Sequence, residues 1–308
     1  MRRTSALLVS LALALSACGG GGGSDPAAPA LRDDPAFPVM VRAANGEVEI
    51  PARPSRIVSL SPTATEMLFA IGAGGEVVAV DDQSDYPPGV PTTELSGYEP
   101  NVEAIVEYEP DLVVATSAGS LKSLDDLGVP LLVQTAASDL DDAYRQFEQL
   151  GEATGRADEA AEEVARIESR IAEIVAGVPD HEKPPTYYHE LDDTYFSVTS
   201  ETFIGQLYAL AGFENIADEA KGAGTGYPQL SAEYIIEADP DFVFLGDSEC
   251  CNQTPARVSK RPGWDQISAV ERGAVFDVGD DVSSRWGPRV VDFLQTVVDA
   301  IQEKAPVD

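Results

Sequence analysis

The chain has 308 residues, with 53 Asp or Glu against 20 Lys or Arg, and its formal net charge is −33. Such an acidic surface repels phosphate backbones and anionic lipid headgroups, so the composition argues against binding to nucleic acid. The length allows one large or two medium domains after an N-terminal leader.

The first 17 residues have the organisation of a lipoprotein signal peptide. Two arginines precede an apolar stretch at 6–15, which is too short to span a bilayer as a stop-transfer helix, and Leu-Ser-Ala leads into Cys18 as in a bacterial lipobox. The alternative is an ordinary signal peptide followed by a chance cysteine. The glycine run at 19–23 favours lipidation, because a lipidated cysteine needs a flexible leash. We predict a tether over 18–36 and an extracytoplasmic location, anchored to the cell membrane through lipid on Cys18.

From residue 39 onward the sequence predicts strands and helices in alternation. A hairpin over 39–50 turns at Asn45-Gly46, and Thr63 with Glu66 has the spacing of a capping box. We expect strands at 56–60, 77–80, 112–115 and 131–133, and helices at 63–72, 102–108, 121–127 and 140–150. This alternation predicts a parallel sheet covered on both faces.

A long amphipathic helix over 158–175 separates this series from a second one. The second series has expected strands at 187–191, 242–245 and 275–278, and expected helices at 203–211, 231–238 and 286–305. The fold class is therefore α/β, with one lobe over 37–155, a connecting helix over 156–178 and another lobe over 179–308. Since a helix is a stiff link, we expect only small closing motions between the lobes.

Two segments, 101–116 and 231–246, repeat one pattern of helix, Pro-Asp and strand. Each places a glutamate, Glu103 or Glu233, in the first turn of its helix, where the helix dipole favours an ionised carboxylate. Convergence on a common helix ending would also explain the similarity. The repeated placement nonetheless suggests a partner with two equivalent basic sites.

Cys250 and Cys251 are adjacent, and two interpretations are equally open for them. In an oxidising compartment they would form a vicinal disulfide; otherwise they remain separate thiols. Four ligands at zinc spacing are missing from the sequence, so we expect no metal site.

Several ordered motifs resemble substrate-binding proteins of ABC importers for iron complexes and cobalamin. They are RIVSLSPTATEMLFAIG at 56–72, NVEAI at 101–105, EPDLVV at 109–114, GFENI at 212–216 and RWGPR at 285–289. The similarity covers about residues 50–305. It implies two Rossmann-like lobes joined by one rigid helix, a ligand cleft between them, no cofactor and no enzymatic activity.

The resemblance also implies partners and site residues. A metal chelate, cobalamin or a ferric siderophore, would be passed to a dimeric ABC permease with its ATPase, and Glu103 and Glu233 match the glutamates that dock on the permease. The stretch DYPP at 85–88 resembles the matching stretch of the cobalamin binders and so favours cobalamin as the ligand. Ligand-binding candidates lie on predicted loops and are Tyr86, Tyr98, Tyr195, Phe196, Tyr227, Arg285 and Trp286. Taken singly, each aromatic residue is about as compatible with ordinary core or surface packing as with ligand binding.

Arg285 and Arg289 are candidates to receive a carboxylate or phosphate of the ligand. Alternatively, Arg289 pairs with Asp292 on its own helix.

Two other functions were weighed against transport of a chelate. A protein that binds a metal ion directly needs several histidines with carboxylates, and this chain has only His181 and His189. An extracytoplasmic α/β enzyme is the other alternative, but no dinucleotide-binding glycine motif or nucleophile elbow follows a predicted strand.

Overall fold

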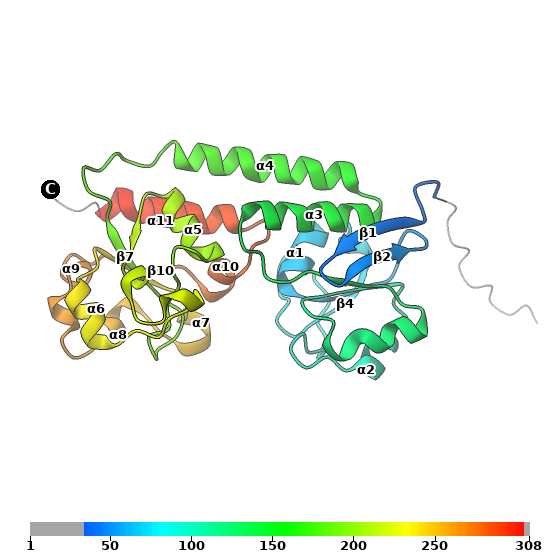
Figure 1. Cartoon of the computed structure of the whole chain (residues 1–308), viewed down its shortest axis with the longest axis horizontal. Coiled ribbons are helices and arrows are strands. Elements are labelled where there is room, and N and C mark those ends of the chain that lie inside the picture. The colour runs from blue at the N-terminus through cyan, green and yellow to red at the C-terminus, as the bar shows by residue number, and fades with distance from the viewer. Residues whose placement is uncertain (1–33, 305–308) are drawn as a thin grey trace, which may run out of the picture. The chain divides into compact units, whose positions relative to one another are not determined.

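The computed structural model describes residues 34–304, in which two parallel sheets form the centres of two α/β lobes (Figure 1). The predicted fold class is confirmed. An antiparallel hairpin of β1 (Val39–Ala43) and β2 (Gly46–Ile50) precedes the first sheet. Within the described residues, no helix combines the length and the apolar character needed to cross a membrane.

The first lobe is built on a four-stranded sheet in the order β4-β3-β5-β6. Its short strands are almost entirely buried, as expected for a parallel sheet covered on both faces. The strands are β3 (Ile57–Leu60), β4 (Val77–Val80), β5 (Leu112–Ala115) and β6 (Leu131–Val133), and the helices are α1 (Pro62–Ala70), η1 (Gly74–Glu76), α2 (Val102–Val106), η2 (Gly119–Leu127) and α3 (Leu140–Thr154).

The second lobe has a sheet in the order β10-β9-β7-β8 and a core rich in stacked aromatic rings. Its strands are β7 (Thr186–Glu190), β8 (Glu214–Asn215), β9 (Phe242–Leu245) and β10 (Val275–Asp277). Its helices are α5 (Phe203–Leu210), η3 (Ile216–Glu219), η4 (Ala223–Thr225), α6 (Ala232–Ala238), α7 (Ser248–Cys251), α8 (Pro255–Val258), η5 (Trp264–Gln266), α9 (Ser268–Glu271), α10 (Asp280–Ser284) and α11 (Val290–Lys304).

The two sheets share one topology and one register at their centres. Ile57 pairs with Leu112 in the first lobe, and Tyr187 pairs with Phe242 in the second. Ile57 and Tyr187 are separated by the same number of residues as Glu103 and Glu233, and so are Leu112 and Phe242. The sequence repeat therefore reflects two equivalent β-α-β units rather than a shared helix ending.

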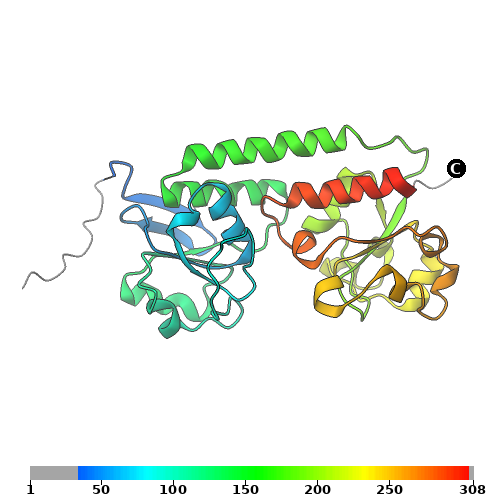
Figure 2. The ribbon, with the colours of Figure 1, turned by 180° about the vertical axis from the view of Figure 1, so that it is seen from behind.

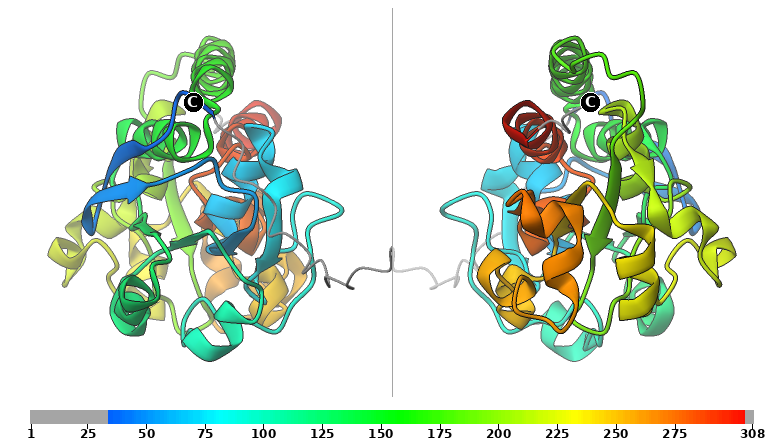
Figure 3. Two further views of the ribbon diagram at one scale, coloured as in Figure 1. Left: turned by 90° about the vertical axis from the view of Figure 1, so that its right-hand side faces the viewer. Right: turned by 90° about the vertical axis from the view of Figure 1, so that its left-hand side faces the viewer.

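Helix α4 (Ala157–Val175) connects the lobes and packs on α3 and α11. Its buried face carries Ala160, Ile167, Ile171 and Ile174 at helical spacing. The three helices form a layer on one side of the sheets, as the reverse and end-on views show (Figures 2 and 3). The stiff connection expected from the sequence is therefore supported by packing as well as by hydrogen bonds within the helix.

Some predicted helix boundaries were wrong. Ser61, not Thr63, caps α1, since its Oγ accepts from the Ala64 N–H at 3.3 Å and Glu66 is used elsewhere. The helix expected over 286–305 begins only at Val290, after the separate helix α10, because Pro288 disfavours helical backbone in the residue before it. The segment predicted as a helix over 121–127 is a 3-10 helix.

Candidate functional site

A cavity of about 250 Å³ lies between the lobes, at the carboxyl ends of strands in the first sheet. Loops after parallel strands meet at one edge of a sheet, which is where open α/β folds bind ligands. The first lobe supplies residues that follow β3, β4 and β5, and the second lobe supplies α10 and the turn before α11. The lining residues are Ser61, Pro62, Thr63, Gln83, Thr116, Asp281, Ser284, Arg285 and Trp286.

Two arginines of the second lobe converge on one buried carboxylate of the first. The Nη1 of Arg285 is 3.0 Å from Glu66 Oε1, and the Nε of Arg289 is 3.0 Å from Glu66 Oε2. The Glu66 side chain is fully buried. Arg289 thus pairs across the lobes rather than with Asp292, the alternative considered from the sequence.

Arg285 has further partners that use its remaining donors. Its Nη2 donates to the Gln83 carbonyl oxygen at 3.0 Å and forms an ion pair with Asp281 at 2.5 Å, and its Nη1 lies 3.3 Å from Asp85. With only 7 % of its side chain exposed, Arg285 lines the cavity but its charge is already matched by carboxylates.

Two of the predicted aromatic residues lie at this ion-pair network. Trp286 lines the cavity, and its indole N–H donates to Gln146 Oε1 of the first lobe at 2.7 Å. The guanidinium of Arg289 lies 4.3 Å from the centre of the Tyr86 ring, within range of a cation–π interaction.

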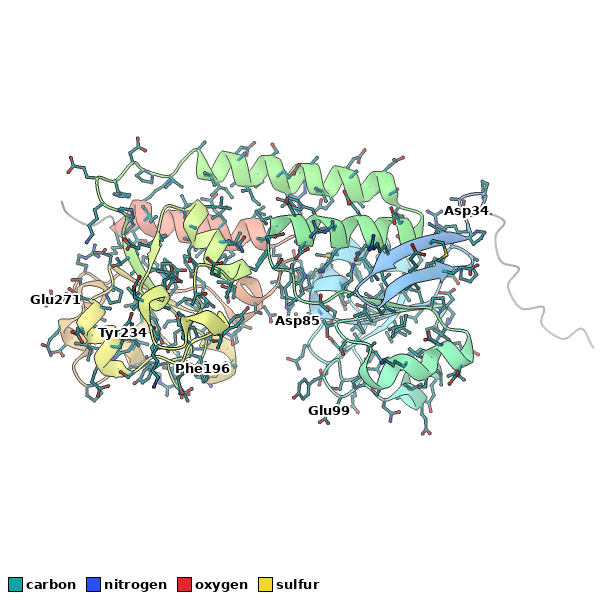
Figure 4. All side chains as sticks on the ribbon, viewed as in Figure 1. Asp34, Asp85, Glu99, Phe196, Tyr234 and Glu271 are labelled. Carbon is teal, nitrogen blue, oxygen red and sulfur yellow. A yellow bond between two sulfur atoms is a disulfide. The ribbon has the colours of Figure 1, made fainter. Side chains whose placement is uncertain are left out.

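Three other candidates are exposed on loops: Tyr98, which is 93 % exposed, Tyr227 and Phe196. Phe196 and Asp85 mark the sides of the two lobes that are nearest each other in Figure 4. Tyr195 differs, because its half-buried ring stacks on Trp264 at 6.0 Å within the second lobe. The structure therefore does not place Tyr195 at the cavity.

Sequence reasoning missed a buried polar cluster at the carboxyl end of the second sheet. Arg261 donates to both oxygens of Glu190, at 2.5 and 2.6 Å, and stacks on Trp264. Asp247 is fully buried beside this pair. Burial first, and the neighbouring Glu190 next, together raise the pKa of Asp247 to about 8. The available signal was a string of polar residues directly after a buried strand.

The histidines considered as metal ligands are not brought together at this site. His189 is fully buried, with Nδ1 2.9 Å from the Tyr208 hydroxyl, and burial lowers its pKa to about 3. Within residues 34–304 there is no group of three or more His, Cys, Asp or Glu arranged to hold a metal ion.

Helix α7 is held against α10 beside the cavity. Cys250 and Cys251, in α7, are joined by a disulfide. The carboxylate of Asp280 accepts from the backbone N–H groups of Glu249, at 2.9 Å, and Cys250, at 2.7 Å. The backbone of Glu249 is therefore fixed by Asp280, the residue before Asp281, which lines the cavity.

The two glutamates of the sequence repeat occupy equivalent exposed positions. Glu103 follows the cap Asn101 of α2, and Glu233 follows the cap Ser231 of α6. Residues 101–110 and 231–240 have the same order of exposed and buried positions. Both helices lie on the side of the lobes away from α4 (Figure 1).

The amino-acid sequence is similar to a known protein family and to individual proteins of that kind. The family model described as "Periplasmic binding protein" matches residues 57–282. An uncharacterised ABC transporter substrate-binding lipoprotein of Bacillus subtilis is 31 % identical over 86 % of this chain and 86 % of its own length. A cobalamin-binding protein of Halobacterium salinarum is 32 % identical over 96 % of this chain and 84 % of its own length.

A solved structure supports the same relationship. A possible iron-binding (periplasmic solute-binding) protein of Staphylococcus epidermidis superimposes with a TM-score of 0.71. It is 28 % identical, and the match covers 81 % of this chain and 99 % of the other.

Proposed function

This chain belongs to the periplasmic binding protein family, and we propose that it captures a metal chelate, cobalamin or a ferric siderophore, between its lobes for an ABC permease. Its relatives include a substrate-binding protein of an ABC transporter and a cobalamin-binding protein. The observation that carries the proposal is the cavity between the lobes, lined by residues after β3, β4 and β5 and by Arg285 and Trp286.

Aromatic residues around the cavity supply the contacts that a flat chelate needs. Trp286 lines the cavity and Tyr86 lies against Arg289 of the ion-pair network, while Tyr98, Phe196 and Tyr227 present exposed rings on loops of the two lobes. Stacking on such rings suits a macrocycle or an aromatic chelate. We assign Tyr195 a supporting role, since it packs on Trp264.

The ligand experiment begins with the visible absorption and mass of any compound that copurifies with the protein. Titrations with cyanocobalamin and ferrioxamine B then test binding directly. Replacing Tyr98 or Tyr227 by Ala should weaken binding about threefold to tenfold through lost stacking. Leu127→Ala, at an exposed apolar residue of η2, is the matched control. The proposal is wrong if neither chelate binds and no chelate copurifies.

We also propose that lipid on Cys18 anchors the protein to the outer face of the cell membrane. Cys18 lies outside the described residues, so the support is the lipobox-like sequence and the glycine run behind it. Cys18→Ala should release the protein into the soluble extracytoplasmic fraction, as measured by fractionation and immunoblotting. Ser24→Ala is the control, and membrane retention of the Cys18 variant would contradict the proposal.

Glu103 and Glu233 complete the proposed function as docking residues for a dimeric permease with its ATPase. Their support is the equivalent position, exposure and capping of the two helices. A permease dimer offers two equivalent sites, which a binding protein with two equivalent lobes can meet at once.

A further inference from the structure

The positive charge at the cavity is neutralised before any ligand arrives. Arg285 lines the cavity and Arg289 lies beside it, and both donate to the buried carboxylate of Glu66. Arg285 also bonds to Asp281 and Asp85. A carboxylate or phosphate of a ligand would have to displace these partners, because the planar guanidinium of Arg285 has few donors left.

Further carboxylates surround this network on both lobes. The side chain of Asp85 is 73 % exposed, and Glu249 is exposed on α7 of the second lobe. Partial desolvation raises the pKa of Glu249, and the charges of Asp281, Asp280 and Asp85 raise it further. Carboxylates of both lobes, Asp85 and Asp281, therefore oppose the ionised form of Glu249.

Two loops beside the cavity add no compensating cations. The segment 81–95, which follows β4, contains four acidic residues and no Lys or Arg. The segment 191–202, which follows β7, contains three acidic residues and also no Lys or Arg. In the second lobe, Arg261 is held by Glu190, and Arg257 is held by the carbonyl oxygen of Asn252 at 2.7 Å.

We propose that the cleft selects uncharged or cationic chelates over anionic ones, and that Glu66 sets this preference by occupying both cavity arginines. This inference rests on the proposed function and narrows its substrate class. Glu66 is a specificity-determining residue that acts through Arg285 and Arg289. Asp85 and Glu249 reinforce the preference and can accept hydrogen bonds from amide N–H groups on the periphery of a chelate.

The physical basis is the sign of the charge in a partly desolvated cleft. An anionic chelate must approach several carboxylates, and like charges brought together across an interface are strongly unfavourable. An amide-bearing uncharged chelate meets the same carboxylates as hydrogen-bond acceptors. Because the cleft opens to solvent, added salt should reduce the discrimination between chelates of different charge.

The test compares chelates of different charge on the intact protein at low salt. The probes are cyanocobalamin, which is uncharged, ferrioxamine B, which is cationic, and ferric enterobactin, which is a multiply charged anion. We expect at least one of the first two to bind more tightly than the anion. In Glu66→Gln and in Glu249→Lys, the ratio of affinities should shift toward the anionic probe by about tenfold.

Glu162→Lys is the matched control, since Glu162 is an exposed acid on α4, away from the cavity. It changes the net charge as much as Glu249→Lys but should leave every affinity unchanged. If Glu66→Gln fails to fold, Glu249→Lys alone decides the result. Preferential binding of the anionic probe by the unaltered protein would overturn the inference.

A second measurement is independent of the ligand. The chain has two tryptophans, and Trp264 is fully buried, so collisional quenching of fluorescence reports mainly on Trp286 in the cavity. With each quenching constant divided by that for free N-acetyltryptophanamide, caesium should quench more efficiently than iodide, and Glu66→Gln and Glu249→Lys should each reduce this difference. Iodide-selective quenching would overturn the inference. Caesium-selective quenching without binding of any chelate would reject the proposed function while supporting the inferred charge of the cleft.

Discussion

At the scale of single residues, Asp247 shows how burial changes the pKa of a carboxyl group. Its carboxyl is fully buried, and neither oxygen has a hydrogen-bond partner among the described residues. Four neighbours act on it: Glu190 and Tyr188 of β7, Asp280 of α10, and Arg261 in the loop after α8. Burial first, and Glu190 next, raise its pKa to about 8, so the folded protein holds a proton that an unfolded chain releases near pH 4.

This difference in proton binding sets the sign of a pH effect on stability. The folded state binds more protons than the unfolded state between about pH 4 and pH 8, so the free energy of unfolding should fall as pH rises through that range. The stability from Asp247 is fully present below about pH 4 and is lost as pH rises through about 8. Asp247→Asn should flatten the dependence and add ~1–3 kcal/mol at pH 8.5, because a neutral amide replaces a buried, unpartnered carboxylate.

Chemical denaturation at several pH values measures this effect. Asp193→Asn, at an exposed aspartate of the same lobe, is the control and should follow the unaltered protein. Equal pH dependence in Asp247→Asn and the unaltered protein would show that Asp247 does not take up the proton.

At the scale of elements, α2 and α6 are the repeated features that bear on docking. Each begins at a polar cap, and each is followed by a non-glycine residue with positive φ, 48° at Glu109 and 45° at Asp239. A carboxylate two residues later then binds the start of a neighbouring strand: Asp111 accepts from the Arg56 N–H, and Asp241 from the Thr186 N–H. The two lobes therefore hold Glu103 and Glu233 in matched local frames.

Replacing Glu103 or Glu233 by Ala should weaken the complex with the permease and leave ligand affinity nearly unchanged. A rim ion pair affects mainly association and salt dependence, whereas a desolvated pair costs ~2–5 kcal/mol when one partner is removed. The double variant should be worse than either single one. Uptake and binding to the permease are measured beside ligand titration.

The chain supplies matched controls for the docking prediction. Glu107 and Glu237 are equivalent exposed glutamates near the other ends of the same two helices. Their replacement by Ala should leave uptake intact. Normal uptake by the Glu103/Glu233 double variant would contradict the docking role. The two glutamates would then serve only to stabilise the first turns of their helices.

At the scale of the whole molecule, contacts beyond α4 connect the lobes. Gln206 donates to the Ser138 carbonyl oxygen at 2.8 Å, and Trp286 donates to Gln146 at 2.7 Å. The fully buried Glu66 binds Arg285 and Arg289 of the second lobe. These links oppose a large change in the angle between the lobes.

Solution scattering with and without bound chelate should give curves that superimpose within error. Glu66→Ala is the informative comparison: it leaves two guanidiniums without their buried carboxylate and should lower the free energy of unfolding by ~3–5 kcal/mol. We expect scattering from that variant to depend on ligand. A marked decrease in the radius of gyration of the unaltered protein on binding would contradict the expected rigidity.

Much of this architecture was predictable because its causes are local. Apolar runs of four residues bounded by turn signals marked most strands, and the 3.6-residue period of 158–175 marked the connecting helix. The helix expected over 286–305 was misplaced at its start, where Pro288 follows Gly287 and helical periodicity alone does not reveal the break.

The sequence by itself determined the α/β class, the internal repeat and the exposed position of Glu103 and Glu233. Each depends on periodicity or on residues close together in the chain. Only the tertiary structure decided that Glu66 binds Arg285 and Arg289, more than two hundred residues away. The same holds for the charged neighbours of Asp247 and for the packing of Tyr195 on Trp264. Those outcomes depend on which side chains compete for one partner in the folded core, and spacing along the chain carries no information about that competition.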